Sequence, residues 1–245
     1  MGKERADLLL VRKGLVETRE KAKRLIMAGA VKAGEKRIRK PSELIEENEE
    51  LKVTETLPYV SRGGLKLAFA LDHFGIEIRG KVVLDVGAST GGFTDCLIKR
   101  GAKKVYALDV GYGQLDWRLR KDPRVVPIER QNIRYFSKEQ LPQPVDLITV
   151  DVSFISLKKV LPHLIPLVIE GGEILCLIKP QFEVGKEEVE KKGIIKTPEK
   201  HKKVVEEISI FAQNIGLVSK GIIPSPILGV KGNKEFFIYL VKPKG

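Results

Sequence analysis

A glycine-rich stretch in the first half of the chain has the composition of a ligand-binding loop. In VVLDVGASTGGFTDC, Val82–Cys96, an apolar run ends at Asp85 and then breaks into glycines, of which Gly87 is the first. A dinucleotide-binding fingerprint would need a second glycine at Ser89. A Walker A phosphate loop would need a lysine where this chain has Phe93. The remaining pattern, D-x-G-x-x-x-G-G, predicts a loop whose backbone approaches a ligand without a phosphate to neutralise.

Two lysines and two acids stand at the ends of predicted elements. Lys66 precedes the first strand of the second part of the chain, Asp151 and Lys179 end later strands, and Glu235 opens the last strand. Ligands of parallel sheets gather at the carboxyl ends of the strands, so we expect these side chains on one edge. A lysine can take a proton from a poorly acidic hydroxyl when burial or a second cation lowers its pKa. Taken singly, each residue also suits a surface lysine or a capping acid.

Alternating helix and strand patterns must position these residues. Pro58 and a glycine pair punctuate TLPYVSRGG, which we interpret as a linker. The pattern after it predicts an open, mostly parallel, doubly wound α/β sheet. We expect the polar segment 183–200 to form a mobile flap. The predicted strands are 81–87, 103–110, 125–129, 145–153, 172–180, 216–225 and 234–243, and the predicted helices are 64–74, 93–101, 157–168 and 198–215.

The glycine pattern is similar to the first motif of class I S-adenosylmethionine methyltransferases, which have a Rossmann-like fold. The resemblance implies that Asp109, after the second strand, meets the ribose hydroxyls of the cofactor, and that Asn132, after the third, meets its adenine. Alternatively, Asp109 caps a helix and Asn132 serves a turn. The full set of cofactor contacts implied is Asp85, Gly87, Ala88, Ser89, Gly91, Gly92, Phe93, Asp109, Asn132 and Asp151.

Residues at the end of the fourth strand bear on the group that is methylated. The turn DVSF, 151–154, lacks the prolines of DNA-adenine amino methyltransferases. Neither Cys96 nor Cys176 follows a proline, as the nucleophile of carbon-5 cytosine methyltransferases does. Base methylation of these two types is therefore disfavoured.

The order Lys66, Asp151, Lys179, Glu235 resembles the catalytic tetrad of FtsJ-type ribose 2′-O-methyltransferases. On this resemblance we expect Lys179 to be the base and Asp151 to orient it, while Lys66 perturbs the site and positions phosphate or ribose. Glu235 would hold the second lysine in place.

Longer motifs extend the resemblance to the whole chain. They are VSRGGLKL, DVGASTGGFTD, TVDVSFISL and KPQFEVGKEEVEKKGIIKTPEKH, and with them the chain resembles the TlyA family, members of which have been labelled haemolysins. This resemblance implies transfer of a methyl group from S-adenosylmethionine to a ribose 2′-hydroxyl of ribosomal RNA, at a cytidine. It also implies a class I fold with an antiparallel last strand over residues 61–245.

Residues 1–60 have the pattern of a small, basic α/β domain. Residues 1–40 contain thirteen Lys and Arg against five Asp and Glu. The stretch RADLLLVRKGLVETREKAKRLIMAGAVKAGEKRI resembles the RNA-binding module first seen in a small-subunit ribosomal protein and shared with pseudouridine synthases and tyrosyl-tRNA synthetase. Its Lys and Arg side chains would contact RNA phosphates. Alternatively, any single lysine could belong to a solvated charged face, and Arg62 could be a charge of the linker. The predicted RNA contacts are Arg5, Arg19, Lys23, Arg24, Lys36 and Arg62.

Composition limits the classes of partner. The net charge of +12 and pI near 9.6 favour a polyanion, with a generally basic protein as the alternative. Two cysteines and three scattered histidines indicate neither a disulfide framework nor a metal site. No stretch has the length and apolarity of a membrane span, so we expect a cytoplasmic protein, and a monomer that binds ribosomal subunits. We also expect Trp117 to pack rather than to stack on a base.

Two rival functions stay open. One is a non-catalytic RNA-binding factor in ribosome assembly that keeps a methyltransferase-like fold. The other is a membrane-active haemolysin, although the two basic helices that we expect within residues 6–28 are polar on too many sides for a good membrane-binding face. Turnover of the cofactor would separate the enzyme from both.

Overall fold

The computed structural model describes residues 2–27, 29–38, 40–53, 58–185, 194–195, 197–229 and 232–245. The chain divides into two compact units, Met1–Leu65 and Lys66–Gly245. The side chain of Arg24, predicted to contact RNA, lies outside the described residues, as do residues 186–193 and 196 of the predicted flap.

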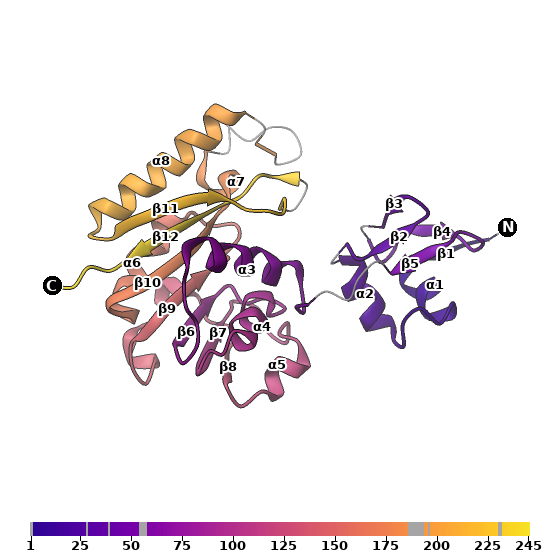
Figure 1. Cartoon of the computed structure of the whole chain (residues 1–245), viewed down its shortest axis with the longest axis horizontal. Helices are drawn as coiled ribbons and strands as arrows, with labels where there is room; N and C mark the ends of the chain where they lie inside the picture. Colours follow the sequence, from indigo (N-terminus) through magenta and orange to yellow (C-terminus); the bar gives the residue numbers. More distant parts are fainter. Residues whose placement is uncertain are drawn as a thin grey trace. The chain divides into compact units, whose positions relative to one another are not determined.

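The first unit pairs two helices with short strands (Figure 1). Thr18 Oγ1 accepts a hydrogen bond from the Lys21 amide at 3.2 Å and so caps the start of the second helix. Gly29, at φ +74°, supplies the left-handed residue that follows this helix. Leu9, Leu10 and Ile26 are buried in the core of the unit. Its elements are β1 (Lys3–Arg5), α1 (Ala6–Arg12), α2 (Arg19–Met27), β2 (Val31–Ala33), β3 (Lys36–Arg37), β4 (Leu44–Glu46) and β5 (Leu51–Val53); β1 pairs with β4, and β2 with β3 and β5.

The second unit is built on a seven-stranded sheet in the order β11-β12-β10-β9-β6-β7-β8. Strand β12 runs antiparallel to both of its neighbours, and the other pairs described are parallel. The prediction of a doubly wound, mostly parallel sheet with an antiparallel last strand is confirmed. The central strands read as continuous apolar runs because both of their faces are covered. The strands are β6 (Val82–Val86), β7 (Lys104–Leu108), β8 (Val125–Ile128), β9 (Val145–Val150), β10 (Val168–Ile178), β11 (Val218–Pro224) and β12 (Phe236–Val241).

Helices cover the sheet, and Figure 1 shows the longest of them, α8, running alongside β11 at one edge. The predicted helix 157–168 is wrong as a continuous helix. Pro162 and Pro166 lack the amide proton that a helix interior needs, and the segment splits into three short turns. The helices are α3 (Arg62–Phe74), α4 (Gly92–Lys99), α5 (Trp117–Lys121), α6 (Leu161–Leu164), α7 (Pro180–Glu183) and α8 (Pro198–Asn214), with 3-10 turns at Ile133–Tyr135, Lys138–Gln140, Leu157–Lys159 and Ile165–Leu167.

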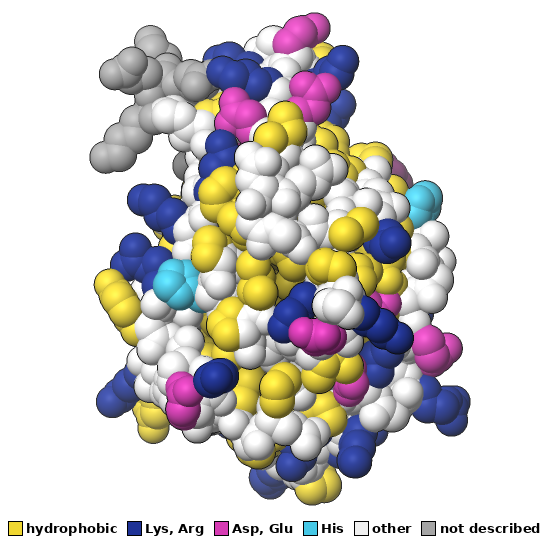
Figure 2. All heavy atoms as spheres, turned by 90° about the vertical axis from the view of Figure 1, so that its left-hand side faces the viewer, with side chains coloured by type: hydrophobic (Ala, Val, Ile, Leu, Met, Phe, Trp, Pro, Cys, Tyr) yellow, Lys and Arg dark blue, Asp and Glu magenta, His cyan; other side chains and the backbone are white. Residues whose placement is uncertain are grey.

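Lys and Arg side chains do not form a single patch on the face of the molecule that Figure 2 shows. Lys and Arg side chains are dispersed there, with acidic and apolar side chains between them. Residues 41–245 carry only +4 of the net charge of +12, so most of the basic excess lies in the first forty residues.

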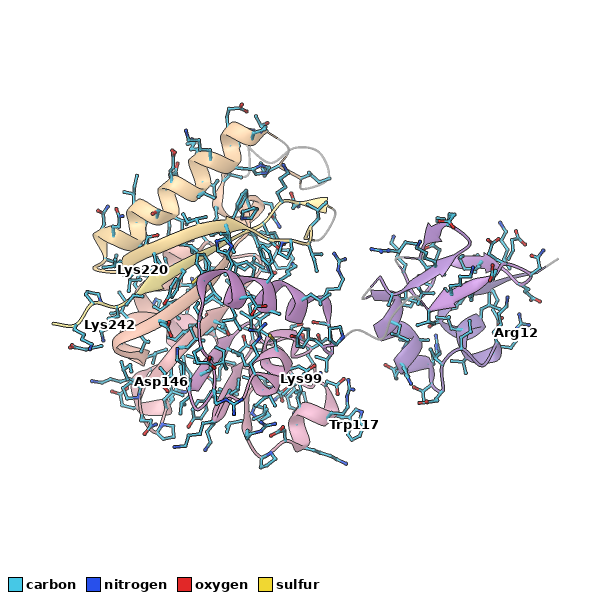
Figure 3. All side chains as sticks on the ribbon, viewed as in Figure 1. Arg12, Lys99, Trp117, Asp146, Lys220 and Lys242 are labelled. Carbon is cyan, nitrogen blue, oxygen red and sulfur yellow. The ribbon has the colours of Figure 1, made fainter. Side chains whose placement is uncertain are left out.

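Trp117 begins α5, a short helix that the sequence pattern did not predict. Asp116 caps it, because its side chain accepts a hydrogen bond from the Arg118 amide at 3.0 Å. The prediction that Trp117 packs is wrong, because this residue, labelled in Figure 3, is 59% exposed. Lys121 Nζ lies 4.9 Å from its ring centroid.

Candidate active site

The glycine loop follows β6 and lies against the end of β9. Gly87 has φ +84°, and a β-carbon on it would lie 2.5 Å from the Asp151 carbonyl oxygen and 2.9 Å from the Asp151 carbonyl carbon. The Gly87 amide donates to the Leu108 carbonyl at 2.8 Å. Glycine is therefore required here by both the backbone angle and the lack of space.

The rest of the loop shapes the start of α4. Gly91, at φ +96°, is the N-cap, and a β-carbon there would lie 2.7 Å from Leu115 Cδ1. Phe93 is 3% exposed and stacks against Phe237 with ring centroids 6.2 Å apart. Gly91 and Phe93 therefore pack the loop against the protein core.

A cavity of about 990 Å³ opens at the carboxyl ends of the parallel strands, where ligands of doubly wound sheets bind. Five predicted cofactor contacts line it, namely Gly87, Ser89, Asp109, Asn132 and Asp151. The other five, Asp85, Ala88, Gly91, Gly92 and Phe93, are not part of its lining. The rest of the wall includes Val110, Gln114, Ile133, Arg134, Ser153, Phe154, Ser156, Lys159, Phe182, Glu183 and Val184.

Asp85 is a buried acid behind the cavity. Its carboxyl accepts hydrogen bonds from Thr94 Oγ1 at 2.7 Å and Thr149 Oγ1 at 2.9 Å. Burial raises the pKa of Asp85 to about 7. The residue joins α4 to β9 under the glycine loop, so its place in the structure is that of a support for the loop.

Asp109 and Asn132 line the cavity and also organise their own loops. Asp109 accepts hydrogen bonds from the amides of Ser89 at 2.8 Å and Gly111 at 2.7 Å. Asn132 caps the following 3-10 turn by accepting from the Arg134 amide at 3.1 Å. The turn role that the sequence left open for Asn132 is therefore present, together with its place in the cavity wall.

Backbone strain is concentrated around the cavity. Among the residues that the structure describes, the non-glycine residues with positive φ are Ser89 at +50°, Arg130 at +56° and Phe154 at +64°. Ser89 and Phe154 line the cavity, and Arg130 precedes the lining residue Gln131. Strained residues that persist in folded proteins cluster at functional sites, which marks this cavity as one.

The four residues Lys66, Asp151, Lys179 and Glu235, which we call the tetrad, form two ion pairs. Lys179 Nζ lies 2.6 Å from Asp151 Oδ1 and donates to Ser153 Oγ at 2.9 Å. Lys66 Nζ lies 2.6 Å from Glu235 Oε2, and Glu235 is 3% exposed. Sequence reasoning missed Ser153, although it stands two residues after Asp151 in the same motif.

Sheet topology brings the two pairs to one edge. Ile178 and Phe236 are the last registered pair of β10 and β12, so Lys179 and Glu235 continue these strands as neighbours. The Asp151 amide donates to the Val86 carbonyl at 2.9 Å at the same edge. Of the tetrad, Asp151 lines the cavity, and Lys179 reaches that wall through Asp151 and Ser153.

Comparisons with known proteins match both units. Residues 59–242 match the FtsJ-like methyltransferase family, and residues 4–51 match the S4 domain. The chain is 44% identical over 238 residues to the 16S/23S rRNA (cytidine-2′-O)-methyltransferase TlyA of Mycobacterium tuberculosis, covering 96% of this chain and 89% of that protein. The chain belongs to the TlyA family. It is also 40% identical to Hemolysin A of Brachyspira hyodysenteriae, over 97% of this chain and 99% of that protein. A solved structure from Streptococcus thermophilus that carries the name hemolysin has a TM-score of 0.79 and 46% identity, over 99% of this chain and 90% of that one.

Membership of the TlyA family makes this chain an S-adenosylmethionine-dependent methyltransferase, and the cavity fits that cofactor. Gly87 leaves a cradle that a β-carbon would fill. The wall carries Asp109 and Asp151, which suit the hydroxyl groups and the positive charge of the cofactor, and the glycine loop holds no lysine for a phosphate. Gly87, Ser89, Asp109, Asn132 and Asp151 are the residues that would hold it.

We call the first unit, Met1–Leu65, the S4 unit, because residues 4–51 match that domain. Several of its cations that were predicted to contact RNA form ion pairs within the protein. Arg5 and Arg19 both bind Asp7, a fully buried acid that sequence reasoning missed, at 3.0 and 2.9 Å. Hydrogen bonds from Arg5, and then from Arg19, lower the pKa of Asp7 to about 2 against the opposing effect of burial. Lys23 pairs with the exposed Glu20, and Lys36 with Glu43, at 2.7 Å each.

The two arginines therefore stabilise the S4 unit as well as presenting charge, since 39% and 48% of their side chains stay exposed. Arg62 is the first residue of α3 and stands one helical turn before Lys66.

Two further features bear on the alternatives. No helix within the described part of the chain is long and apolar enough to cross a membrane. In the same residues, His, Cys, Asp and Glu do not form a group of three that could hold a metal ion.

Proposed function

We propose that this protein transfers a methyl group from S-adenosylmethionine to the 2′-hydroxyl of a cytidine ribose in ribosomal RNA. The observation that carries the proposal is the Lys179–Asp151 pair, because Asp151 lies in both the cofactor cavity and the tetrad. The name of the Mycobacterium tuberculosis relative, a 16S/23S rRNA (cytidine-2′-O)-methyltransferase, supports both the nucleotide and the class of RNA.

The chemistry needs a base beside the cofactor. S-adenosylmethionine supplies a methyl group on a sulfonium, which passes in line to a nucleophilic oxygen. Lys179 Nζ, as the neutral amine, takes the proton of the ribose hydroxyl as that oxygen attacks, and the methyl–sulfur bond would break to leave a neutral thioether. Asp151 at 2.6 Å and Ser153 at 2.9 Å hold the nitrogen in place, and the Asp151 carboxylate neutralises the ammonium that forms. Lys66, held by Glu235, supplies a second positive charge at the same edge for the ribose or its phosphate.

The cavity wall beyond Asp151 suits a nucleotide. Phe154 is 89% exposed, and its ring lies 5.0 Å from that of Phe182. Lys159, exposed in the same wall, adds a cation. Aromatic faces with a nearby cation bind unstacked bases and their phosphates, so this end of the cavity is the RNA side in our proposal.

The S4 unit would bind the RNA that brings the substrate nucleotide to the cavity. Residues 1–40 carry a net charge of +8, and charge of that sign attracts phosphates without reading sequence.

The test is methyl transfer to isolated ribosomal subunits that lack the modification. Purified protein and labelled S-adenosylmethionine are incubated with each subunit, and the labelled RNA is hydrolysed with alkali. A 2′-O-methyl group blocks cleavage at its nucleotide, so the label should appear in an alkali-resistant dinucleotide beginning with cytidine. Label in a base, or no label on either subunit while the protein binds the cofactor, would contradict the proposal. The second outcome would favour a non-catalytic role in ribosome assembly.

A further inference from the structure

The tetrad residue Glu235 is buried next to Gly229, a residue of the segment between β11 and β12. Its side chain is 3% exposed, and one carboxylate oxygen, Oε2, pairs with Lys66. The other oxygen, Oε1, lies directly against Gly229 in that loop.

The Glu235 side chain fills the space that a side chain on Gly229 would need. A β-carbon on Gly229 would overlap Oε1 of Glu235 and would lie 2.5 Å from Cδ and 3.1 Å from Cγ of the same residue. The φ angle of Gly229 is not in the left-handed region that favours glycine. An alanine could therefore adopt this backbone, and what requires glycine at this position is the carboxylate of Glu235.

Backbone hydrogen bonds fix the loop on both sides of this contact. The Gly229 amide donates to the Asn233 carbonyl at 2.8 Å, and the Ser225 amide donates to the Glu235 carbonyl at 2.8 Å. Glu235 and Gly229 are thus held by two cross-links within one short loop, and neither can shift far without breaking one of them.

Asn233 joins this loop to the start of α8. Its side-chain oxygen accepts a hydrogen bond from the Ile195 amide at 3.0 Å, and the Ile195 carbonyl lies 3.0 Å from His201 Nε2. A carbonyl can only accept, so Nε2 carries the proton. Asn233, Ile195 and His201 are 2%, 2% and 5% exposed. Buried, satisfied polar networks of this kind fix one geometry.

We propose that Gly229 is a positioning residue of the methyl-transfer site. By leaving space for the Glu235 carboxylate it keeps that group on Lys66 Nζ, and the Asn233–Ile195–His201 network keeps the loop where that space exists. The inference rests on the proposed role of the tetrad, because displacement of Glu235 matters only if the Lys66–Glu235 pair serves the reaction.

A double-mutant cycle tests the proposal with the full-length protein. The single-turnover rate of methyl transfer to ribosomal subunits, with enzyme in excess, is measured for wild type, Gly229→Ala, Glu235→Ala and the double variant. We expect Gly229→Ala to slow transfer at least tenfold and to leave the dissociation constant for S-adenosylmethionine within twofold, because neither residue lines the cavity. In the Glu235→Ala background, where the carboxylate is gone, the same substitution should change the rate less than twofold.

Gly232→Ala is the matched control in the same loop. Gly232 has φ +88°, and no described residue other than its chain neighbours comes within 4 Å of the point that its β-carbon would occupy, so alanine there strains the backbone without touching Glu235. Its rate should stay within twofold of wild type below its melting temperature. The inference is overturned if Gly229→Ala transfers methyl at the wild-type rate, or if it costs as much without Glu235 as with it. If Glu235→Ala itself is fully active, the proposed role of the tetrad fails instead.

Discussion

The carbonyl oxygen of Asp151 occupies the space that any side chain on Gly87 would enter, with 2.5 Å between that oxygen and a β-carbon at position 87. The cofactor loop is therefore packed directly on the backbone of Asp151, the residue whose carboxylate lies beside Lys179 Nζ. A change in the loop that displaces this backbone displaces the group that orients the base.

Gly87→Ala should weaken cofactor binding and methyl transfer together. The left-handed angle alone costs about 1–2 kcal/mol for alanine, and the overlap with Asp151 adds to it. We expect the dissociation constant for S-adenosylmethionine, measured by calorimetry, to rise at least tenfold. Gly80→Ala is the control, because Gly80 has φ +78° and, among the residues that the structure describes, none beyond its chain neighbours comes within 4 Å of its β-carbon position. Equal affinity losses in both variants would mean that backbone strain, and not the contact with Asp151, is responsible.

Lys179→Ala should abolish most of the methyl transfer and spare cofactor binding. Removal of a general base typically costs about 10²–10⁴-fold in rate, and Lys179 is not part of the cavity lining. Lys220→Ala, at an exposed position on β11 labelled in Figure 3, should transfer methyl at the wild-type rate. A Lys179→Ala variant with more than a tenth of the wild-type rate would remove this lysine from the proposed role.

Strand ends could be predicted because periodicity and parallel topology act over short distances. Asp109, Asp151, Lys179 and Glu235 all stand next to the strand ends where the sequence placed them, since the buried strands are largely apolar runs that are flanked by polar residues. The partners of these residues could not be predicted in the same way. Asp7 binds two arginines predicted to meet RNA, and Gly229 holds Glu235, through contacts between segments that only tertiary packing brings together.

The predicted roles in the glycine loop divide for the same reason. Gly87 and Ser89 line the cavity, whereas Asp85 and Phe93 face the core behind it. A motif gives the residue types that a loop needs, but it does not separate those that touch a ligand from those that support the loop. Asp85 supports it through Thr94 and Thr149, of which Thr149 lies far along the chain.

Asp85→Asn should change how stability depends on pH. The pKa of Asp85 is about 7 in the folded protein and near 3.8 in the unfolded chain. At pH values between these two pKa values, the carboxyl group has lost its proton in the unfolded chain and keeps it in the folded protein. The wild type therefore loses stability as the pH rises through this range. Asparagine has no proton to lose. The free energy of unfolding of the variant minus that of wild type should therefore increase by roughly 3 kcal/mol between about pH 5 and pH 8. Urea unfolding at several pH values measures this difference, and a difference that does not vary with pH would contradict the assignment.

Arg19→Ala and Lys23→Ala should separate a structural role from contact with RNA. Arg19 binds the buried Asp7, and a hydrogen bond between charged groups of this kind contributes about 1.5–3 kcal/mol. Hydrogen exchange of the α1 and α2 amides should therefore speed up at least tenfold in Arg19→Ala.

Lys23 pairs with the exposed Glu20, and exposed pairs contribute little to stability, so Lys23→Ala should leave hydrogen exchange unchanged. If Lys23 meets a phosphate, its loss should instead lower the salt dependence of RNA binding by about one counterion, uniformly across RNA sequences. Unchanged exchange in Arg19→Ala would show that Asp7 does not need its second arginine, and would return Arg19 to the set of residues available mainly for RNA.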